Sequence, residues 1–214
     1  MSPSLDAGGE LLAIRPPLQQ RSRDAWNRVL AAGVGILEDG GYEAFTIAAV
    51  CQRAQVPPRA IYARAASKDA LFLAVYDHAM ARIRTEHTVF DDDRPWHELF
   101  ADQVVAKVVR EVAGIFFRHA ALLRAVVLIS GAHPEVYRRG SREVHALGDK
   151  FTARLLSTGG TDQPEPAVRA AFDVVFSALV VRTAYGPGFA TPETDDEQFV
   201  RSLTEIVHGY LLRR

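Results

Sequence analysis

The first residues with a chemistry to explain lie in QVPPRAIYARAASKDAL, at positions 55–71, where two prolines precede several cations and an aromatic ring. Arg59 carries paired N–H donors that match the O6 and N7 acceptors on the edge of a guanine base. Tyr62 and Lys68 suit phosphate oxygens, and Arg64 adds another cation close by. These residue types favour contact with a nucleic-acid duplex if the surrounding helices hold them on one surface.

The paired prolines determine the local structure of this stretch. Pro57 and Pro58 hold φ at about −65° and exclude the preceding residues from the α region, so a helix over residues 47–54 must end before them. Pro58 can open a new helix without cost, because the first helical N–H has no partner within the helix. We therefore expect a third, short helix in which Ile61 faces the core and the outward surface is formed by Arg59, Ala60 and Tyr62.

Apolar spacing and capping residues predict the neighbouring helices. Apolar side chains recur at helical spacing from Arg21 until Gly40-Gly41, where glycine permits the left-handed conformation that ends a helix. Thr46 supplies an N-cap oxygen for the second helix, and Ser67 does so for a fourth helix that runs through Ile83. Three helices with a tight turn between the last two match the helix-turn-helix plan, in which the third helix lies in the DNA major groove.

The remainder of the chain also shows helical spacing. We expect a long helix from Pro95 to Ile115, an enclosed helix over residues 119–130, and last helices that carry residues 168–180 and 199–211. No segment alternates apolar and polar residues with a period of two, so the predicted fold is all-α with about nine helices. The predicted organisation is a flexible arm at 1–20, a helix-turn-helix DNA-binding domain at 21–67 and a larger helical domain at 68–214.

Composition is that of a globular protein in a reducing compartment. The chain has 214 residues, 48% of them apolar, and no apolar run approaches the roughly 20 residues that cross a bilayer. The single cysteine, Cys51, lies on the apolar face of the second helix and cannot form an internal disulfide. The N-terminus lacks the pattern of a secretion signal, so we expect a cytoplasmic protein.

The net charge of −1 conceals an uneven distribution along the chain. Residues 21–68 hold seven Arg or Lys against four Asp or Glu, whereas acidic residues outnumber basic ones in residues 69–214. The cationic excess coincides with the predicted helix-turn-helix, and it indicates an anionic partner.

Residues 42–71, YEAFTIAAVCQRAQVPPRAIYARAASKDAL, resemble the N-terminal motif of the tetracycline-repressor (TetR) family of bacterial transcription regulators. The matching features are Gly41-Tyr42, Thr46-Ile47, Ala54, Val56, Ile61-Tyr62, and Ser67-Lys68 ahead of Leu71. The chain departs from the pattern where Gln55 replaces a turn glycine, Pro57 a capping serine, and Arg64-Ala65 the usual His-Phe. Together, the resemblance and the residue chemistry assign DNA contacts to Thr46, Pro57, Pro58, Arg59, Ala60, Tyr62, Arg64 and Lys68.

The resemblance also implies a role for the larger domain. In such regulators this domain binds a small-molecule effector and dimerises through its last two helices, so we expect a homodimeric repressor that the effector releases from a palindromic operator. The candidate ligand-binding residues are Trp96, Phe100, Phe116, His119, Leu123, Val127, His133, Tyr137, Phe172 and Phe176. The candidate dimer-interface residues are Phe172, Val175, Phe176, Leu179, Phe199, Leu203, Ile206 and Tyr210.

Two other classes of function stay open on the sequence. A helical protein-interaction module would use the apolar penultimate helix to bind another protein. An enzyme would need an active site assembled from distant residues, because the chain has no G-x-S-x-G or H-E-x-x-H motif, and Gly33-Val34-Gly35 is followed by Glu38 where a phosphate loop has glycine. We expect no enzymatic activity, no cofactor and no metal, since the seven histidines lack metal-ligand spacing.

Overall fold

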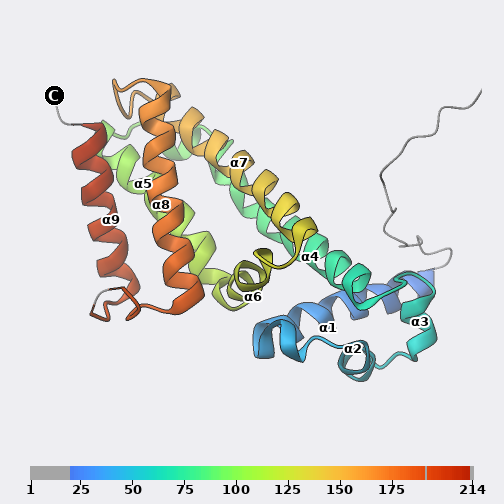
Figure 1. Cartoon of the computed structure of the whole chain (residues 1–214). Helices are drawn as coiled ribbons and strands as arrows, with labels where there is room; N and C mark the ends of the chain where they lie inside the picture. Colours follow the sequence, from blue (N-terminus) through green and yellow to red (C-terminus); the bar gives the residue numbers. More distant parts are fainter. Residues whose placement is uncertain (1–19, 191, 213–214) are drawn as a thin grey trace, which may run out of the picture. The chain divides into compact units, whose positions relative to one another are not determined.

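The computed structural model describes residues 20–190 and 192–212, and these residues form nine α-helices, two short 3-10 helices and no strand (Figure 1). The prediction of an all-α fold is confirmed. The described chain divides into two compact units, one ending at Met80 and the other beginning at Ala81. The predicted arm at 1–20 lies outside the described residues except for Gln20, which begins the first helix.

The N-terminal unit consists of three helices and the first part of a fourth. Helix α1 spans Gln20–Ala44, α2 Ile47–Ala54, α3 Pro58–Tyr62 and α4 Lys68–Arg84. The expected helix end at Gly40-Gly41 is present, because Gly41 has φ 66° and interrupts the helical conformation of α1. The core of this unit includes the fully buried side chains of Val29, Leu37, Phe45, Val50, Ile61, Leu71, Phe72 and Val75.

The start of α4 therefore belongs to the packing of the N-terminal unit. Its residues Leu71, Phe72 and Val75 have essentially no exposed surface, and Phe72 packs edge-on against Phe45 with ring centroids 5.7 Å apart. The compact unit accordingly ends at Met80, within α4, whereas the sequence placed the start of the second domain at residue 68.

Two glycines in α1 allow neighbouring elements to approach closely. A Cβ atom on Gly33 would lie 2.5 Å from Val75 Cγ2 and 3.2 Å from Phe45 Cε2. A Cβ atom on Gly35 would lie 2.5 Å from the Arg53 Nη2 atom. The Gly33-Val34-Gly35 sequence thus serves helix packing in α1.

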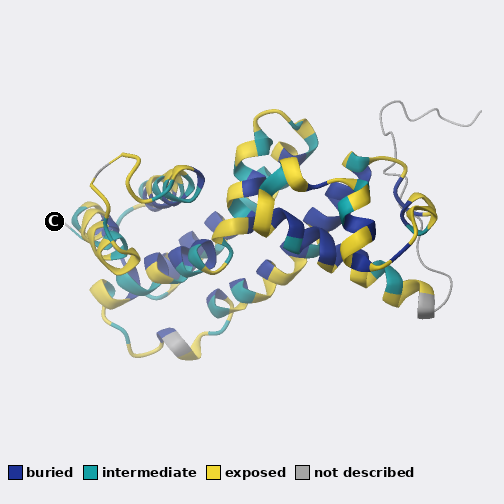
Figure 2. Ribbon diagram, turned by 90° about the horizontal axis from the view of Figure 1, so that it is seen from below, coloured by how far each residue is buried: buried dark blue, intermediate teal, exposed yellow. Residues whose placement is uncertain are grey.

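The C-terminal unit is built around α5. After the 3-10 helices η1 (Thr85–Phe90) and η2 (Arg94–Trp96), the chain forms α5 (Ala101–Arg118), α6 (Ala120–Ser130), α7 (Pro134–Ser157), α8 (Glu165–Tyr185) and α9 (Asp196–Leu211). Helix α5 packs against α6, α7, α8 and α9. Figure 2 shows buried residues on the inward faces of the helices and exposed residues on their outer faces. The buried side chains of α5 are Val104, Val105, Val108, Val109, Val112, Ala113, Ile115 and Phe116.

Two expectations for this unit were wrong. The long helix begins at Ala101 and not at Pro95, because Phe100 has extended backbone (ψ 161°) and its N–H donates to the Gln103 side chain over 2.9 Å. The enclosed helix is α5 and not α6, which buries only one stripe and leaves Leu128 53% exposed. No single described helix is long and apolar enough to cross a bilayer; α5 and α6 meet that test only as a pair bent by 85°.

The close approach at Gly33 gives the first prediction. Gly33→Ala should destabilise the N-terminal unit by about 1–3 kcal/mol, because the added methyl group collides with the buried Val75 and Phe45 side chains. Chemical denaturation followed by circular dichroism would measure the loss. Gly131→Ala is the matched control, since no atom lies within 4 Å of its added Cβ. Equal unfolding midpoints for the two variants would contradict the packing role of Gly33.

Candidate functional site

The turn between α2 and α3 is fixed by satisfied helix ends. Thr46 Oγ1 accepts a hydrogen bond from the Ala49 N–H over 3.1 Å, as its capping position predicts. Gln55 adopts the left-handed conformation with φ 53° and ψ 49°, which only glycine adopts without strain. The next N–H, that of Val56, donates to the Cys51 carbonyl over 3.1 Å, and the Val56 side chain is buried. The turn thus keeps its geometry although Gln55 replaces glycine.

Helix α3 presents two of the predicted contact residues to solvent. Pro57 is extended and provides no side-chain cap, and Pro58 occupies the first helical position, as predicted. Ile61 is completely buried, whereas Arg59 is exposed and Tyr62 is 57% exposed. Within the described residues, the Arg59 guanidinium makes no ion pair. Both side chains are therefore available to a partner on one short helix.

Lys68 is held beside the aromatic ring of Tyr42. Its Nζ atom lies 3.9 Å from the centroid of the Tyr42 ring and donates to the Tyr42 carbonyl over 3.4 Å. The Tyr42 hydroxyl donates to Asp69 Oδ1 over 3.0 Å, and burial together with this bond raises the pKa of Tyr42 to about 12. Ser67 Oγ accepts from the Ala70 N–H over 3.1 Å and caps α4 as predicted. These contacts join the end of α1 to the first turn of α4.

Arg64 lies elsewhere than the sequence predicted. Its side chain is 6% exposed, its guanidinium donates to Ser22 Oγ, and its central carbon lies 5.2 Å from the centroid of the Trp26 ring. Burial lowers the pKa of this guanidinium. The expectation of an exposed cation facing phosphates was wrong for this residue, because the ring of Trp26 offers its stem and its planar group a better-packed position.

Sequence reasoning missed the role of Arg53. Its Nη1 atom lies 2.5 Å from Asp39 Oδ2, and its guanidinium crosses α1 where Gly35 leaves room. The glycine was the available signal, since a residue without Cβ in a helix often marks a close approach. Arg53 stays half-exposed at the C-terminal end of α2.

Comparison with known proteins identifies the domain that contains these residues. Residues 29–75 match the model of the family described as bacterial regulatory proteins, tetR family. The N-terminal unit therefore contains the domain that this tetR family model describes. No curated protein sequence matches the chain.

Solved structures extend the similarity of fold to the C-terminal unit. A transcriptional regulator from Rhodococcus sp. RHA1 aligns with a TM-score of 0.65 at 15% identity, covering 87% of this chain and 95% of that one. A proposed TetR-family transcriptional regulator from Mesorhizobium loti gives 0.67 at 14% identity, with 91% and 98% covered. A TetR-like transcriptional regulator from Rhodococcus sp. RHA1 gives 0.59 at 16% identity, with 89% and 97% covered. The chain has the domain and the fold of a TetR-family transcriptional regulator.

Three of the predicted effector-binding residues of the C-terminal unit lie together. The Phe116 and Phe176 rings meet edge-on at 5.7 Å, and Phe176 stacks on Phe172 at 5.9 Å. Phe151 of α7, which the sequence did not single out, joins them at 5.4 Å from Phe172. Two expectations were wrong, because Phe100 and Tyr137 are among the most exposed large side chains and cannot line an interior pocket.

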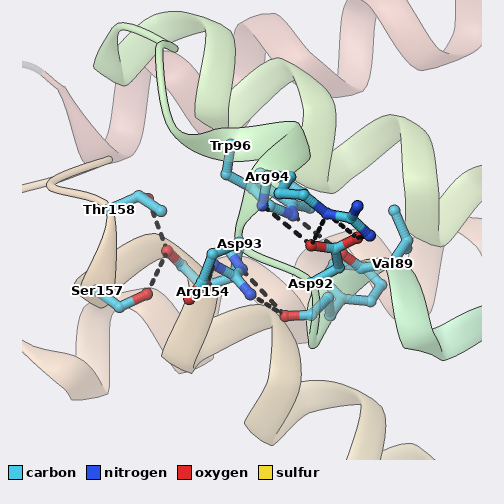
Figure 3. A network of polar contacts seen from close by, with 9 residues as sticks. Val89, Asp92, Asp93, Arg94, Trp96, Arg154, Ser157 and Thr158 are labelled. Carbon is cyan, nitrogen blue, oxygen red and sulfur yellow. Dashed lines mark hydrogen bonds and ion pairs between the residues drawn. The ribbon is translucent and has the colours of Figure 1, made fainter.

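Trp96 belongs to a different cluster, shown in Figure 3. Arg154 reaches from α7 to donate to the Phe90 carbonyl and, over 2.6 Å, to Asp93 Oδ1, while its guanidinium lies 5.3 Å from the Trp96 ring centroid. The Trp96 Nε1–H donates to the Val89 carbonyl over 2.9 Å. Trp96 is thus part of the packing that fixes residues 85–96 on α7.

The remaining effector candidates lie along α6 and at its two ends. His119 Nε2 lies 2.5 Å from Glu86 Oε1, and Arg118 also binds Glu86, so His119 takes part in holding η1 at the bend between α5 and α6. Burial opposes ionisation of Glu86, but the hydrogen bonds from His119 and Arg118 outweigh it and lower the pKa of that carboxyl. The half-buried candidates are Leu123, Val127 and His133.

The predicted dimer-interface residues separate into three groups, which are buried, exposed and half-buried. Phe172, Val175, Leu179 and Leu203 are buried within the chain, so the expectation that they contact a partner was wrong. Ile206 and Tyr210 of α9 are exposed, at 59% and 52%. Phe176 packs in the aromatic cluster, and Phe199 lies half-buried under the Arg182 guanidinium. The exposed apolar residues of α8 are instead Val174, Val181 and Tyr185.

The Tyr42 contacts predict a pH dependence. The folded pKa of about 12 lies above the ordinary value of 10.0, so folding favours the neutral phenol, and this stabilisation is present below pH 10.0 and lost as the pH rises towards 12. An NMR titration of protein with ¹³C-labelled tyrosine rings should contain a resonance that titrates near pH 12, and Tyr42→Phe should remove that resonance. Tyr62→Phe is the control, because Tyr62 is exposed. A Tyr42→Phe spectrum that keeps every resonance titrating near pH 12 would refute the assignment.

Proposed function

We propose that the chain is a homodimeric transcriptional repressor that binds a palindromic DNA operator and is released by a small-molecule effector. The observation that carries the proposal is the exposure of Arg59 and Tyr62 on α3, within the residues that match the tetR family. A short helix after a tight turn, with an exposed guanidinium on its outer face, has the shape and chemistry to enter a major groove. A protein of this kind would act in the bacterial cytoplasm, where the DNA is.

The contact residues would divide the task of recognition. Arg59 can offer two N–H donors to one guanine, which specifies sequence. Tyr62, Lys68 and the capped helix end at Thr46 suit phosphate oxygens, which position the protein without reading sequence. Pro57, Pro58 and Ala60 would contribute by shape, since they have no polar side-chain group.

Dimerisation is proposed from the apolar surface of α8 and α9, which pack side by side in Figure 1. Val174, Val181 and Tyr185 follow one another at spacings of seven and four along α8, so they share a face. Ile206 and Tyr210 are one turn apart on α9 and also exposed. A second copy would cover these side chains from water, and a two-fold axis would place two α3 helices on two half-sites.

We place the effector beside the aromatic cluster of Phe116, Phe151, Phe172 and Phe176, which joins α5, α7 and α8. The same helix as Phe151 carries Thr152, whose buried hydroxyl has no hydrogen-bond partner among the described residues. An apolar molecule with a hydrogen-bonding group would suit this composition. It would release DNA only by binding more tightly to a conformation that fits the operator poorly, because equal affinity for both conformations shifts nothing.

Selection of duplexes from a random library, followed by gel shift, would test DNA recognition. Arg59→Ala should cost about 1–3 kcal/mol of binding free energy and relax the preference at one base pair, whereas Lys68→Ala should weaken all sequences alike. Affinity should also fall steeply with salt, since phosphate contacts release counterions. Arg169→Ala, at an exposed ion pair of the C-terminal unit, is the control. A wild-type protein that enriches no sequence would refute the proposed function.

Light scattering after size-exclusion chromatography would test the proposed dimer. Ile206→Asp should convert the dimer into a monomer, because the interface would then bury an unpaired carboxylate. Leu128→Asp makes the same change at a residue of similar exposure on α6 and should leave the dimer intact. Dissociation by both variants, or by neither, would contradict the location of the interface.

A further inference from the structure

Helix α3 has few anchors of its own. It contains five residues, and an isolated helix of that length has no stability in water, so its direction depends on the contacts around it. At its start, Val56 is buried and the prolines restrict the backbone. In its middle, Ile61 alone is buried. Its last residues, Tyr62 and the cap Ala63, are exposed, so the C-terminal end of α3 needs a contact from beyond the helix.

Arg64 supplies that contact, next to the fully buried Ala65, whose N–H also donates to the Ile61 carbonyl over 2.9 Å. The Arg64 backbone N–H donates to the Ile61 carbonyl over 2.8 Å, which ties Arg64 to the last turn of α3. Its side chain then reaches the start of α1, where the guanidinium donates to Ser22 Oγ and lies 5.2 Å from the Trp26 ring centroid. Ser22 and Trp26 are four residues apart and share one face of α1, so Arg64 contacts two successive turns of that helix.

Burying the charge of Arg64 costs free energy of folding, so stabilisation of the fold alone does not explain why an arginine stands at this position. The side chain is 6% exposed, and among the described residues no Asp or Glu forms an ion pair with it. Burying a cation without a carboxylate disfavours the fold compared with an apolar side chain of similar size. The guanidinium provides what an apolar side chain cannot, namely a planar group that stacks on the indole while it donates to a hydroxyl.

We propose that Arg64 is a positioning residue for DNA recognition, which acts through Trp26 and Ser22 to fix the C-terminal end of α3 on α1. It would thereby set the direction in which Arg59 and Tyr62 leave the surface. The inference rests on the proposed function, because it concerns how the same helix reads a base sequence. Arg64 itself would not contact the DNA.

A loss of positioning has a different signature from a loss of stability. A folded protein with a loosely held α3 keeps its exposed cations, and so it still binds phosphates of any sequence. It loses the bidentate contact to a base edge, which requires accurate placement of the guanidinium. Discrimination between operator and unrelated duplex should therefore fall while binding to the unrelated duplex stays unchanged.

Arg64→Met is the informative variant, because it keeps most of the stem and removes the planar cation. The full chain would be titrated with a duplex selected by the wild-type protein and with a shuffled duplex, at a temperature where circular dichroism shows each variant folded. The ratio of the two affinities should fall about tenfold, the order of one lost base contact. Arg64→Lys should behave like Arg64→Met, since the charge alone cannot reproduce the stacked geometry.

Matched variants separate positioning from destabilisation. Trp26→Phe keeps a ring face and should retain the ratio, whereas Trp26→Leu should lose it as Arg64→Met does. Val29→Ala removes buried methyl groups from α1 and keeps Arg64, Ser22 and Trp26 themselves, so it should leave the ratio unchanged. Fluorine NMR of fluorotryptophan-labelled protein offers a readout without DNA, because only one of the two tryptophan signals, that of Trp26, should shift in Arg64→Met.

The outcomes separate the inference from the function it rests on. Discrimination by the wild type, lost in folded Arg64→Met and kept in Val29→Ala, would support the positioning role. Discrimination that persists in folded Arg64→Met, or that falls equally in Val29→Ala, would overturn this role and leave the proposed function standing. A wild-type protein that selects no duplex would overturn both.

Discussion

A five-residue helix cannot hold its own direction, and the N-terminal unit is arranged around this constraint. The left-handed Gln55 and the two prolines fix where α3 begins, and the burial of Ile61 fixes which face turns inward. The far end is held by Arg64 on the ring of Trp26. The outer face, with Arg59 and Tyr62, is what these contacts leave exposed. DNA recognition by such a helix would therefore depend on the residues that hold it in place as much as on its own exposed side chains.

Local features of this unit could be predicted because their causes lie within a few residues. Thr46 and Ser67 cap the helices that follow them, and each accepts from an N–H three residues ahead. The prolines act on their immediate neighbours. Arg64 could not be placed in this way, because its hydrogen-bond partner Ser22 is 42 residues away in sequence. A pattern shows that a cation is present, but only the fold shows that an indole ring lies within its reach.

The C-terminal unit shows where apolar periodicity stops being informative. The spacing on α8 identifies an apolar helix, but it does not distinguish the face that packs in the chain, with Phe172 and Leu179, from the face with Val174 and Val181. For the same reason α6, although apolar at nearly every position, is less enclosed than the valine-rich α5. The burial of a helix depends on how many other helices pack around it. The apolar spacing within one helix does not fix that number.

The buried guanidinium of Arg154 links residues that no local rule would connect. It satisfies the Phe90 carbonyl and pairs with Asp93, and its charge would be left uncompensated in the interior if that pairing were lost. A change at position 93 would therefore destabilise the fold while Arg154 is present, whereas a change at position 154 would remove the donors to the Phe90 carbonyl and leave the exposed Asp93 in solvent. Relatives of this chain should therefore keep these positions together or replace them together. Substitutions in the connection from α4 to α5 should be correlated with substitutions at position 154.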